Sequence, residues 1–230
     1  KLPNVLSYGA TARLRQELLQ LLHKTFDPNL KNDLNNRFLS LEMMWLENTL
    51  IKSYVLSPRI AKISADLLGI KSVRLYHDNA LAKEPGCGRT PWHYDDHHFP
   101  LATHNVVTAW IPAQAIPIAM GPLAFAKPLN VFELVKNIKF NKFDTSYDKQ
   151  VTDIFKVNNV SIENKPFGAG EVSFHHNQSF HTAAGNRTTR SRVVLANTYF
   201  ADGARIVDHP TMVSGDWQKF IADVSPGEIA

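Results

Sequence analysis

Two histidine-rich segments hold the side chains best suited to chemistry. The chain has ten histidines in 230 residues, with four of them in residues 93–104 and three in residues 175–181. His93 and Asp95 are two positions apart, and on a β-strand such a pair points to one face of the sheet. An imidazole and a carboxylate on one face can bind the same metal ion. This pair alone is weak evidence, because a His-x-Asp/Glu sequence occurs about once by chance at this composition.

The second segment supplies a third candidate ligand. His181 would complete a set of two histidines and one carboxylate, which leaves positions on iron(II) open for a bidentate cosubstrate and dioxygen. Arg192 follows at the start of an apolar stretch. A guanidinium that a strand carries into a core needs an anionic partner, and arginine binds carboxylates through two parallel hydrogen bonds. A cosubstrate with a free carboxylate would suit this position.

Neighbouring polar residues are open to more than one interpretation. Asp96 is either an acceptor for a ligand histidine or a solvated side chain. His175 and His176 lie at the end of a predicted strand, and one of them is expected to face the pocket. Arg190 shares strand parity with Arg192 and competes with it for the anion.

The elements that must position these residues change in type along the chain. Apolar residues at helical spacing predict helices over residues 11–24, 41–53 and 58–68, so that residues 1–70 form a helical N-terminal part. From residue 72 onward, short apolar runs bounded by Pro and Gly predict strands. These runs are residues 72–77, 106–111, 123–126, 171–174 and 192–200. Short strands at this spacing indicate a mainly β jelly roll, with the helices packed on it.

The chain shows no linker, which indicates one domain over residues 1–230. The jelly-roll core is expected over residues 71–208, with a tail over residues 209–230. A polar stretch over residues 130–165, weakly helical near residues 131–138, interrupts the strands. Insertions of this kind commonly form a lid or a binding loop.

Composition excludes several classes of protein. The hydrophobic fraction of 44% and the charged fraction of 20% are those of an ordinary globular chain. No apolar run is long enough to span a membrane. The net charge of +4 comes from scattered Lys and Arg residues, which argues against a nucleic-acid footprint and allows a basic pocket for an anionic or polar small molecule. The single cysteine, Cys87, fits a reducing compartment, and we expect a cytoplasmic protein.

Five ordered segments resemble the phytanoyl-CoA dioxygenase family of iron(II)/2-oxoglutarate oxygenases. They are residues 73–86, residues 90–95, residues 107–112, residues 121–125, and the series His181, Asn186 and Arg192. Residues 199–206 are also similar, so the resemblance covers roughly residues 72–208. It implies a double-stranded β-helix of the cupin type.

The resemblance also assigns roles to single residues. It implies that iron(II) is bound by His93, Asp95 and His181. It places Arg192 on the distal carboxylate of 2-oxoglutarate, Lys83 close to the cosubstrate, and Trp110 near the pocket. Position 183 departs from the family, because Ala183 stands where a hydroxyl is frequent, and Thr182 is a candidate substitute.

The function that this resemblance implies is a non-haem iron(II)/2-oxoglutarate-dependent dioxygenase. Such an enzyme uses dioxygen to hydroxylate an unactivated C–H bond of a small molecule and releases succinate and carbon dioxide. Two alternatives remain open: a catalytically silent jelly-roll binding module, and a cupin-type metal enzyme that uses His93, His98 and His181 without 2-oxoglutarate. Desaturation, epimerisation and ring formation use the same ligand set, and neither the substrate nor the oligomeric state follows from the sequence.

Overall fold

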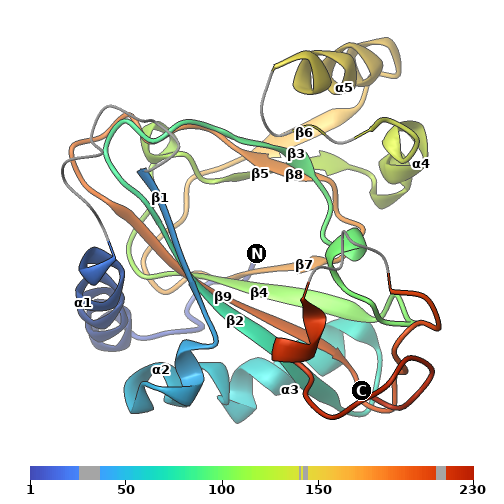
Figure 1. Ribbon diagram of the computed structural model, residues 1–230. Helices are drawn as coiled ribbons and strands as arrows, with labels where there is room; N and C mark the ends of the chain where they lie inside the picture. The colour runs from blue at the N-terminus through green and yellow to red at the C-terminus, as the bar shows by residue number, and fades with distance from the viewer. Residues whose placement is uncertain (26–36, 140, 142–144, 211–215) are drawn as a thin grey trace.

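The computed structural model describes residues 1–25, 37–139, 141, 145–210 and 216–230. Its strands form two antiparallel sheets that face each other (Figure 1). The larger sheet has the order β1-β2-β9-β4-β7, and the smaller sheet has the order β3-β8-β5-β6. The strands are β1 (Phe38–Glu42), β2 (Val73–Lys83), β3 (Thr90–His93), β4 (Val106–Pro112), β5 (Leu123–Lys127), β6 (Ser161–Asn164), β7 (Ser173–His176), β8 (His181–Ala183) and β9 (Arg192–Ala201). This arrangement confirms the expected jelly roll.

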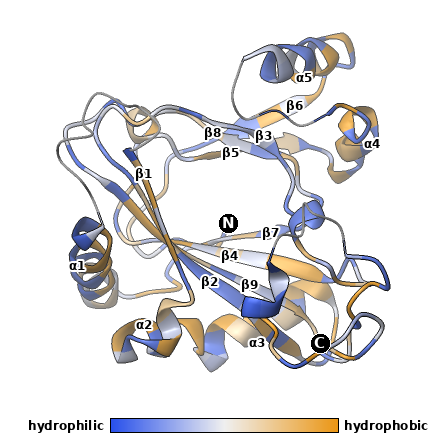
Figure 2. Cartoon of the chain, viewed as in Figure 1, coloured by the Kyte–Doolittle hydropathy of each residue, from blue (hydrophilic) through white to orange (hydrophobic). Residues whose placement is uncertain are grey.

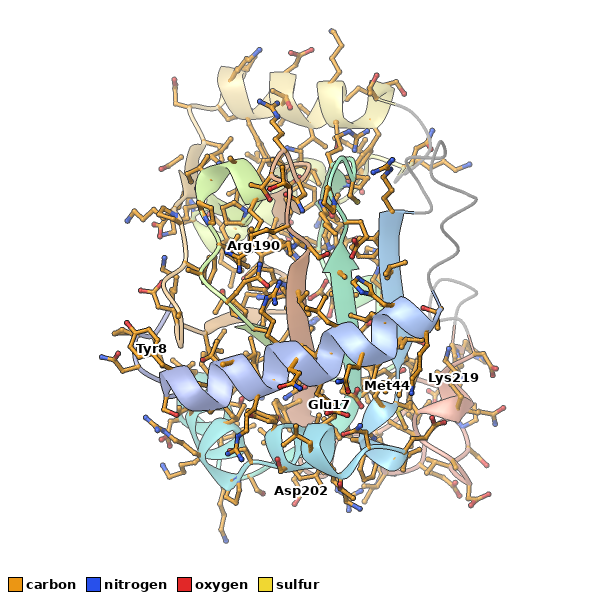
Figure 3. The ribbon with its side chains drawn as sticks, turned by 90° about the vertical axis from the view of Figure 1, so that its left-hand side faces the viewer. Tyr8, Glu17, Met44, Arg190, Asp202 and Lys219 are labelled. Atoms are coloured by element: carbon orange, nitrogen blue, oxygen red, sulfur yellow. The ribbon has the colours of Figure 1, made fainter. Side chains whose placement is uncertain are left out.

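Three helices cover the outer face of the larger sheet: α1 (Tyr8–Lys24), α2 (Thr49–Val55) and α3 (Pro58–Leu68). Each begins with a side-chain cap that accepts a backbone N–H of the first turn, from Ser7, Asn48 and Ser57 respectively. Figure 2 shows hydrophobic and hydrophilic residues alternating along these helices, as expected when one face of each is buried. In Figure 3, α1 crosses the strands, and its Glu17 accepts a hydrogen bond of 2.6 Å from Asn48 at the start of α2.

Strand β9 separates the helical layer from the interior between the sheets. Its odd-numbered residues Val193, Leu195 and Tyr199 pack in the core cluster beneath the helices. Its even-numbered residues Arg192 and Thr198 line the interior cavity. The alternation is that of a regular strand, and it brings polar side chains inside without exposing the apolar face.

Strand β2 contains a bulge that changes which of its residues face the cavity. Leu75 pairs with Tyr199, whereas His77 pairs with Thr198, so Tyr76 is the additional residue. Both Tyr76 and His77 therefore line the cavity. The expected strand over residues 72–77 is the first part of β2, which continues past the bulge.

The helix expected over residues 41–53 was wrong in its first half. Residues 41–42 belong to β1, and Met43 has a left-handed backbone with φ of 60°. The buried Asp78 carboxylate accepts the backbone N–H groups of Met44 and Trp45 at 3.1 and 3.3 Å. These two hydrogen bonds hold Met44 and Trp45 in a tight turn, and α2 begins only after this turn. The apolar residues of this segment are spaced as in a single helix, although they belong in succession to a strand, a turn and a helix.

The polar stretch over residues 130–165 covers the outer face of the smaller sheet (Figure 1). Described residues in it form α4 (Phe132–Val135), α5 (Ser146–Val157) and β6, of which the sequence indicated only the first. Phe155 of α5 packs against Trp92 and Phe180, with ring centroids 5.2 and 5.8 Å away. Strand β6 pairs with β5 at the edge of the sheet. The role of this stretch as a lid stays a prediction.

Two further boundaries differ from the sequence prediction. The strand expected over residues 171–174 begins at Ser173, because the Glu171 carboxylate accepts the Gly168 N–H at 2.9 Å and closes a turn. The described part of the expected tail packs on the protein, and its Lys219 forms an ion pair of 2.8 Å with Glu42 of β1. None of the described helices combines the length and apolarity needed to cross a membrane.

Candidate functional site

The structure brings His93, Asp95 and His181 together. His93 and His181 are directly opposite each other on the paired strands β3 and β8. The Nε2 atoms of His93 and His181 lie 3.8 and 3.9 Å from Asp95 Oδ1, and one ligand atom from each residue lies within 4.8 Å of the others. In the part of the chain that the structure describes, this is the one such cluster of potential ligands.

Backbone carbonyls fix both imidazole rings. Nδ1 of His93 donates to the Pro91 carbonyl at 2.9 Å, and Nδ1 of His181 donates to the Ser179 carbonyl at 2.8 Å. With the proton on Nδ1, each Nε2 keeps its lone pair, and both lone pairs face Asp95. A second hydrogen bond of this kind is usual for histidines that bind metals.

Asp95 reaches the cluster in a different way from the one that strand parity predicted. Strand β3 ends at His93, and Asp95 has a helical backbone at the start of the turn η4 (Asp96–His98). The backbone N–H groups of Asp95 and Asp96 both donate to the Asn177 carbonyl, at 2.8 and 3.0 Å. The turn after the strand, rather than the strand itself, therefore orients this carboxylate.

The electrostatics of the cluster favour a carboxylate at Asp95 and a neutral imidazole at His181. Burial raises the pKa of the Asp95 carboxyl, but the neighbouring His181 and the hydrogen bond from His175 outweigh it and hold the pKa below its usual range. Burial, together with the nearby His93, lowers the pKa of His181 well below 6.5. Deprotonated side chains are those that bind a metal ion.

Arg192 lies buried at the start of β9, in the larger sheet, and lines the same cavity as the cluster. Its Nη1 donates to the Gly121 carbonyl at 2.7 Å, and its guanidinium carbon lies 5.5 Å from the Trp110 ring. Nε is buried and has no hydrogen-bond partner among the described residues, and no carboxylate of that part of the chain lies within ion-pair distance. Burial lowers the pKa of Arg192 to about 10, so the side chain stays charged. A buried cation with free donors suits an anionic ligand.

The other candidates for cosubstrate binding are placed differently. Trp110 lines the cavity beside Arg192. Lys83 is fully buried at the same end, but its Nζ donates to the carbonyls of Ala183 and Ala184 at 3.2 and 3.0 Å. Burial and the nearby Arg192 lower the pKa of Lys83 to about 7. The Thr182 hydroxyl donates to the Thr90 carbonyl at 2.6 Å, and Thr182 does not line the cavity that Ala183 lines. A direct contact of Thr182 with the cosubstrate stays a prediction that this placement does not support.

The three clustered residues, Arg192 and Trp110 line one cavity of about 510 Å³ between the sheets. Arg192 and Thr198 are six residues apart on one face of β9, so the cavity extends roughly 20 Å along the strand. Arg192 and Trp110 lie toward one end. Tyr76, His77, Phe99 and Phe220 line the other end, together with the charged residues Glu42, Asp216 and Lys219.

The remaining histidines and acids have other surroundings. His175 lines the cavity and is buried, whereas His176 lies on the opposite face of β7. His98 also lines the cavity but does not join the cluster of potential ligands. Asp96 accepts a hydrogen bond from the Asn177 side chain and contacts His104, so it does not orient either clustered histidine.

Several cavity residues were missed by the sequence analysis. Thr108 and Thr198 lie in the middle of apolar strands, and their hydroxyl oxygens are 3.2 Å apart on the cavity floor. The sequence signal that could have identified these two threonines is a polar residue inside an apolar strand. His77 could not be placed, because the bulge at Tyr76 changes the parity of β2 without a sequence signature.

The residues present fit an iron(II) ion and a dicarboxylate. Two imidazoles with oriented Nε2 lone pairs and one carboxylate are the donors of the facial triad of non-haem iron oxygenases. The unpartnered Arg192 Nε supplies an independent sign that the cavity takes an anion.

Comparisons with known proteins identify the family and the fold of this chain. The model of the phytanoyl-CoA dioxygenase (PhyH) family matches residues 1–127. No curated protein sequence gives a significant match.

Solved structures show the same fold. The non-heme alpha ketoglutarate dependent carbocyclase SnoK from nogalamycin biosynthesis is 22% identical, with a TM-score of 0.76 over 100% of this chain and 87% of that chain. The epimerase SnoN of the same biosynthesis is 20% identical, with a TM-score of 0.77 over 100% and 89%, and has also been crystallised with Fe3+, alpha ketoglutarate and nogalamycin RO. EctD from S. alaskensis is 16% identical, with a TM-score of 0.73 over 99% and 80%.

Proposed function

The chain belongs to the phytanoyl-CoA dioxygenase family of iron(II)/2-oxoglutarate-dependent oxygenases, and we propose that it hydroxylates an unactivated C–H bond of a small molecule. Succinate and carbon dioxide would be the products of the cosubstrate. The observation that carries the proposal is that His93, Asp95 and His181 converge in a cavity that also contains the buried guanidinium of Arg192, whose Nε has no hydrogen-bond partner among the described residues.

His93 Nε2, His181 Nε2 and Asp95 Oδ1 would hold the iron. When bound, iron(II) supplies the activation of dioxygen, for which no protein side chain is suited. The protein would orient these three atoms: the carbonyls of Pro91 and Ser179 hold the two rings, and the Asn177 carbonyl holds the turn that carries Asp95.

Arg192 would hold the distal carboxylate of 2-oxoglutarate. The guanidinium is fixed by the Gly121 carbonyl and packed beside Trp110, so it needs little reorganisation to accept the ligand. Lys83 would not contact 2-oxoglutarate directly, because its Nζ already donates hydrogen bonds to two carbonyls. Its charge would act on the cosubstrate over a longer distance.

The substrate would approach from the opposite end of the cavity. The rings of Tyr76, Phe99 and Phe220 are in contact there, with centroids 5.1 and 5.3 Å from Tyr76. Glu42 and Lys219 form an ion pair at this end, and Asp216 adds one negative charge. We therefore propose a polar substrate with an apolar or ring-containing body.

The side chains that line this end of the larger cavity do not favour an anionic substrate over a polar one. The sequence analysis allowed an anionic substrate because of the net charge of +4 from scattered Lys and Arg residues. Lys165 and Lys127 line a smaller cavity of about 250 Å³, which shares Leu123 and His175 with the larger one. Neither lysine lines the larger cavity. The single cysteine, Cys87, is buried, and a reducing compartment such as the cytoplasm remains part of the proposal.

Turnover of 2-oxoglutarate tests the proposal. The iron-loaded protein is incubated with 2-oxoglutarate and dioxygen, and succinate is measured by mass spectrometry against a panel of polar ring-containing molecules. We expect succinate to form in the same amount as a product that is heavier than the substrate by one oxygen atom. We expect no succinate with Asp95→Ala. Succinate matched by a product that has lost two hydrogens would indicate desaturation or ring formation in place of hydroxylation. Absence of succinate with bound iron and cosubstrate would favour a silent binding module.

A further inference from the structure

The two oxygens of the Asp95 carboxylate have different neighbours. Oδ1 faces the Nε2 atoms of His93 and His181, at 3.8 and 3.9 Å. Oδ2 faces the larger sheet, where His175 Nε2 lies at 3.3 Å and the Thr108 hydroxyl donates at 3.3 Å. One oxygen is therefore directed to the metal position, while the other is held by two side chains that are not ligands.

The register of the larger sheet places these two side chains next to each other. Four residues at matching positions form one row across β2, β9, β4 and β7: His77, Thr198, Thr108 and His175. All four line the cavity. Within the row, the Thr108 and Thr198 hydroxyl oxygens are 3.2 Å apart. This polar row ends beside Asp95, whose Oδ2 contacts both Thr108 and His175.

The surroundings of His175 determine which of its nitrogens carries the proton. The side chain is 4% exposed, and Nδ1 is buried without a hydrogen-bond partner among the described residues. A buried N–H without an acceptor costs more than an unused lone pair, and an N–H that donates to a carboxylate is a strong hydrogen bond. Both effects place the proton on Nε2, where it points at Asp95 Oδ2.

We propose that His175 is a positioning residue, which together with Thr108 holds Oδ2 of Asp95 so that the carboxylate presents Oδ1 alone to the metal. A carboxylate held in this way binds through one oxygen and leaves an adjacent coordination position open. This inference rests on the proposed function, because it assigns His175 a role toward the same metal.

Metal affinity tests the proposal without any turnover. The wild type and the variants are titrated with cobalt(II) alone, in competition with a chelator. We expect His175→Phe, which keeps the ring but removes the donor, to weaken binding about 10- to 100-fold, the usual effect of losing a residue that orients a ligand. We expect His175→Gln to bind within about threefold of the wild type, because a glutamine amide can place an N–H near the position of Nε2.

His176→Phe is the matched control. It makes the same substitution one residue away, on the opposite face of β7, and should leave the affinity within about twofold of the wild type. Thr108→Val should weaken binding less than His175→Phe, because a neutral hydroxyl donor at 3.3 Å is the weaker partner. Equal affinities of wild type and His175→Phe would overturn the proposal, as would an equal loss in His175→Phe and His175→Gln.

A measurement on the wild type keeps the proposal testable if His175→Phe does not fold. Long-range nitrogen–proton NMR of the zinc-loaded protein distinguishes the two tautomers of His175. The proposal predicts a proton on Nε2 and a free lone pair on Nδ1. A proton on Nδ1, with Nε2 bound to the metal, would show that His175 is a ligand. If the wild type bound no cobalt, the proposed function itself would fail.

Discussion

Replacing Arg192 by Met should remove most of the affinity for 2-oxoglutarate without harming the fold. A guanidinium makes two parallel hydrogen bonds to a carboxylate, and each charge-assisted bond contributes about 1.5–3 kcal/mol. Because Arg192 Nη1 already donates to the Gly121 carbonyl, we take the lower value for both bonds, which gives about 3 kcal/mol. That loss corresponds to a dissociation constant roughly 10²-fold higher.

The free energy of unfolding of Arg192→Met, unlike its affinity for 2-oxoglutarate, should not fall. Arg192 is 2% exposed, and no carboxylate of the described chain lies within ion-pair distance of it. Replacing an unpaired buried cation by an apolar side chain of similar length is commonly neutral or stabilising. We therefore expect the free energy of unfolding of ligand-free Arg192→Met to equal or exceed that of the wild type, as measured by urea denaturation.

The assay compares two 2-oxo acids by anaerobic calorimetry on the iron-loaded protein. 2-Oxoglutarate has the distal carboxylate, whereas 2-oxobutanoate lacks it but has the same groups for chelating iron. Arg192→Met should bind 2-oxobutanoate as the wild type does, and Arg192→Lys should lose about tenfold for 2-oxoglutarate because it keeps the charge but not the paired donors. Our assignment is refuted if Arg192→Met weakens both acids equally, or if it changes the affinity for 2-oxoglutarate by less than threefold.

Further predictions concern stability and the cosubstrate. Gly121→Ala should lower the free energy of unfolding by about 2–4 kcal/mol, because φ is +74° and a Cβ would lie 2.2 Å from the Ala184 carbonyl oxygen. Gly69→Ala, with φ of +68° but nothing within 4 Å, should lose only about 1–2 kcal/mol, and equal losses by urea denaturation would contradict the steric argument. Burial lowers the pKa of His77 from 6.5 to about 4, so the unfolded chain binds a proton that the folded protein does not bind as the pH falls below 6.5. At pH 5 the metal-free protein should therefore have lost at most about 2 kcal/mol of its free energy of unfolding through this group. On going from pH 7 to pH 5, His77→Phe should lose less free energy of unfolding than the wild type by that amount, and equal losses would exclude His77 as a cause. Lys83→Met should raise the dissociation constant of 2-oxoglutarate less than Arg192→Met does, and the reverse order in the same calorimetric assay would mean that Lys83 contacts the ligand.

The triad candidates could be found from the sequence because their chemistry is visible in residue type. Two histidines and a carboxylate in short polar segments stand out, and so does Arg192 before an apolar strand. The reason given for His93 and Asp95 was nevertheless wrong, since the turn held by the Asn177 carbonyl, and not strand parity, orients Asp95.

The rest of the cavity depends on contacts between distant segments. Strand register decides that His175 and Thr108 meet under Asp95, and it is set by pairing between β4 and β7. The bulge at Tyr76 turns His77 inward, although nothing in the local sequence distinguishes it. In the same way, the helix expected over residues 41–53 failed because the Asp78 carboxylate, distant in sequence, binds backbone N–H groups within it.

The most direct test of the central claim is an anaerobic titration of the iron(II)-loaded protein with 2-oxoglutarate, followed by visible absorption. In the wild type we expect a weak charge-transfer band when 2-oxoglutarate binds. We expect Arg192→Met to require roughly 10²-fold more 2-oxoglutarate for the same band, and Asp95→Ala to give none. Iron bound by the wild type without any band at saturating 2-oxoglutarate would contradict the claim that this cavity is an iron(II)/2-oxoglutarate site.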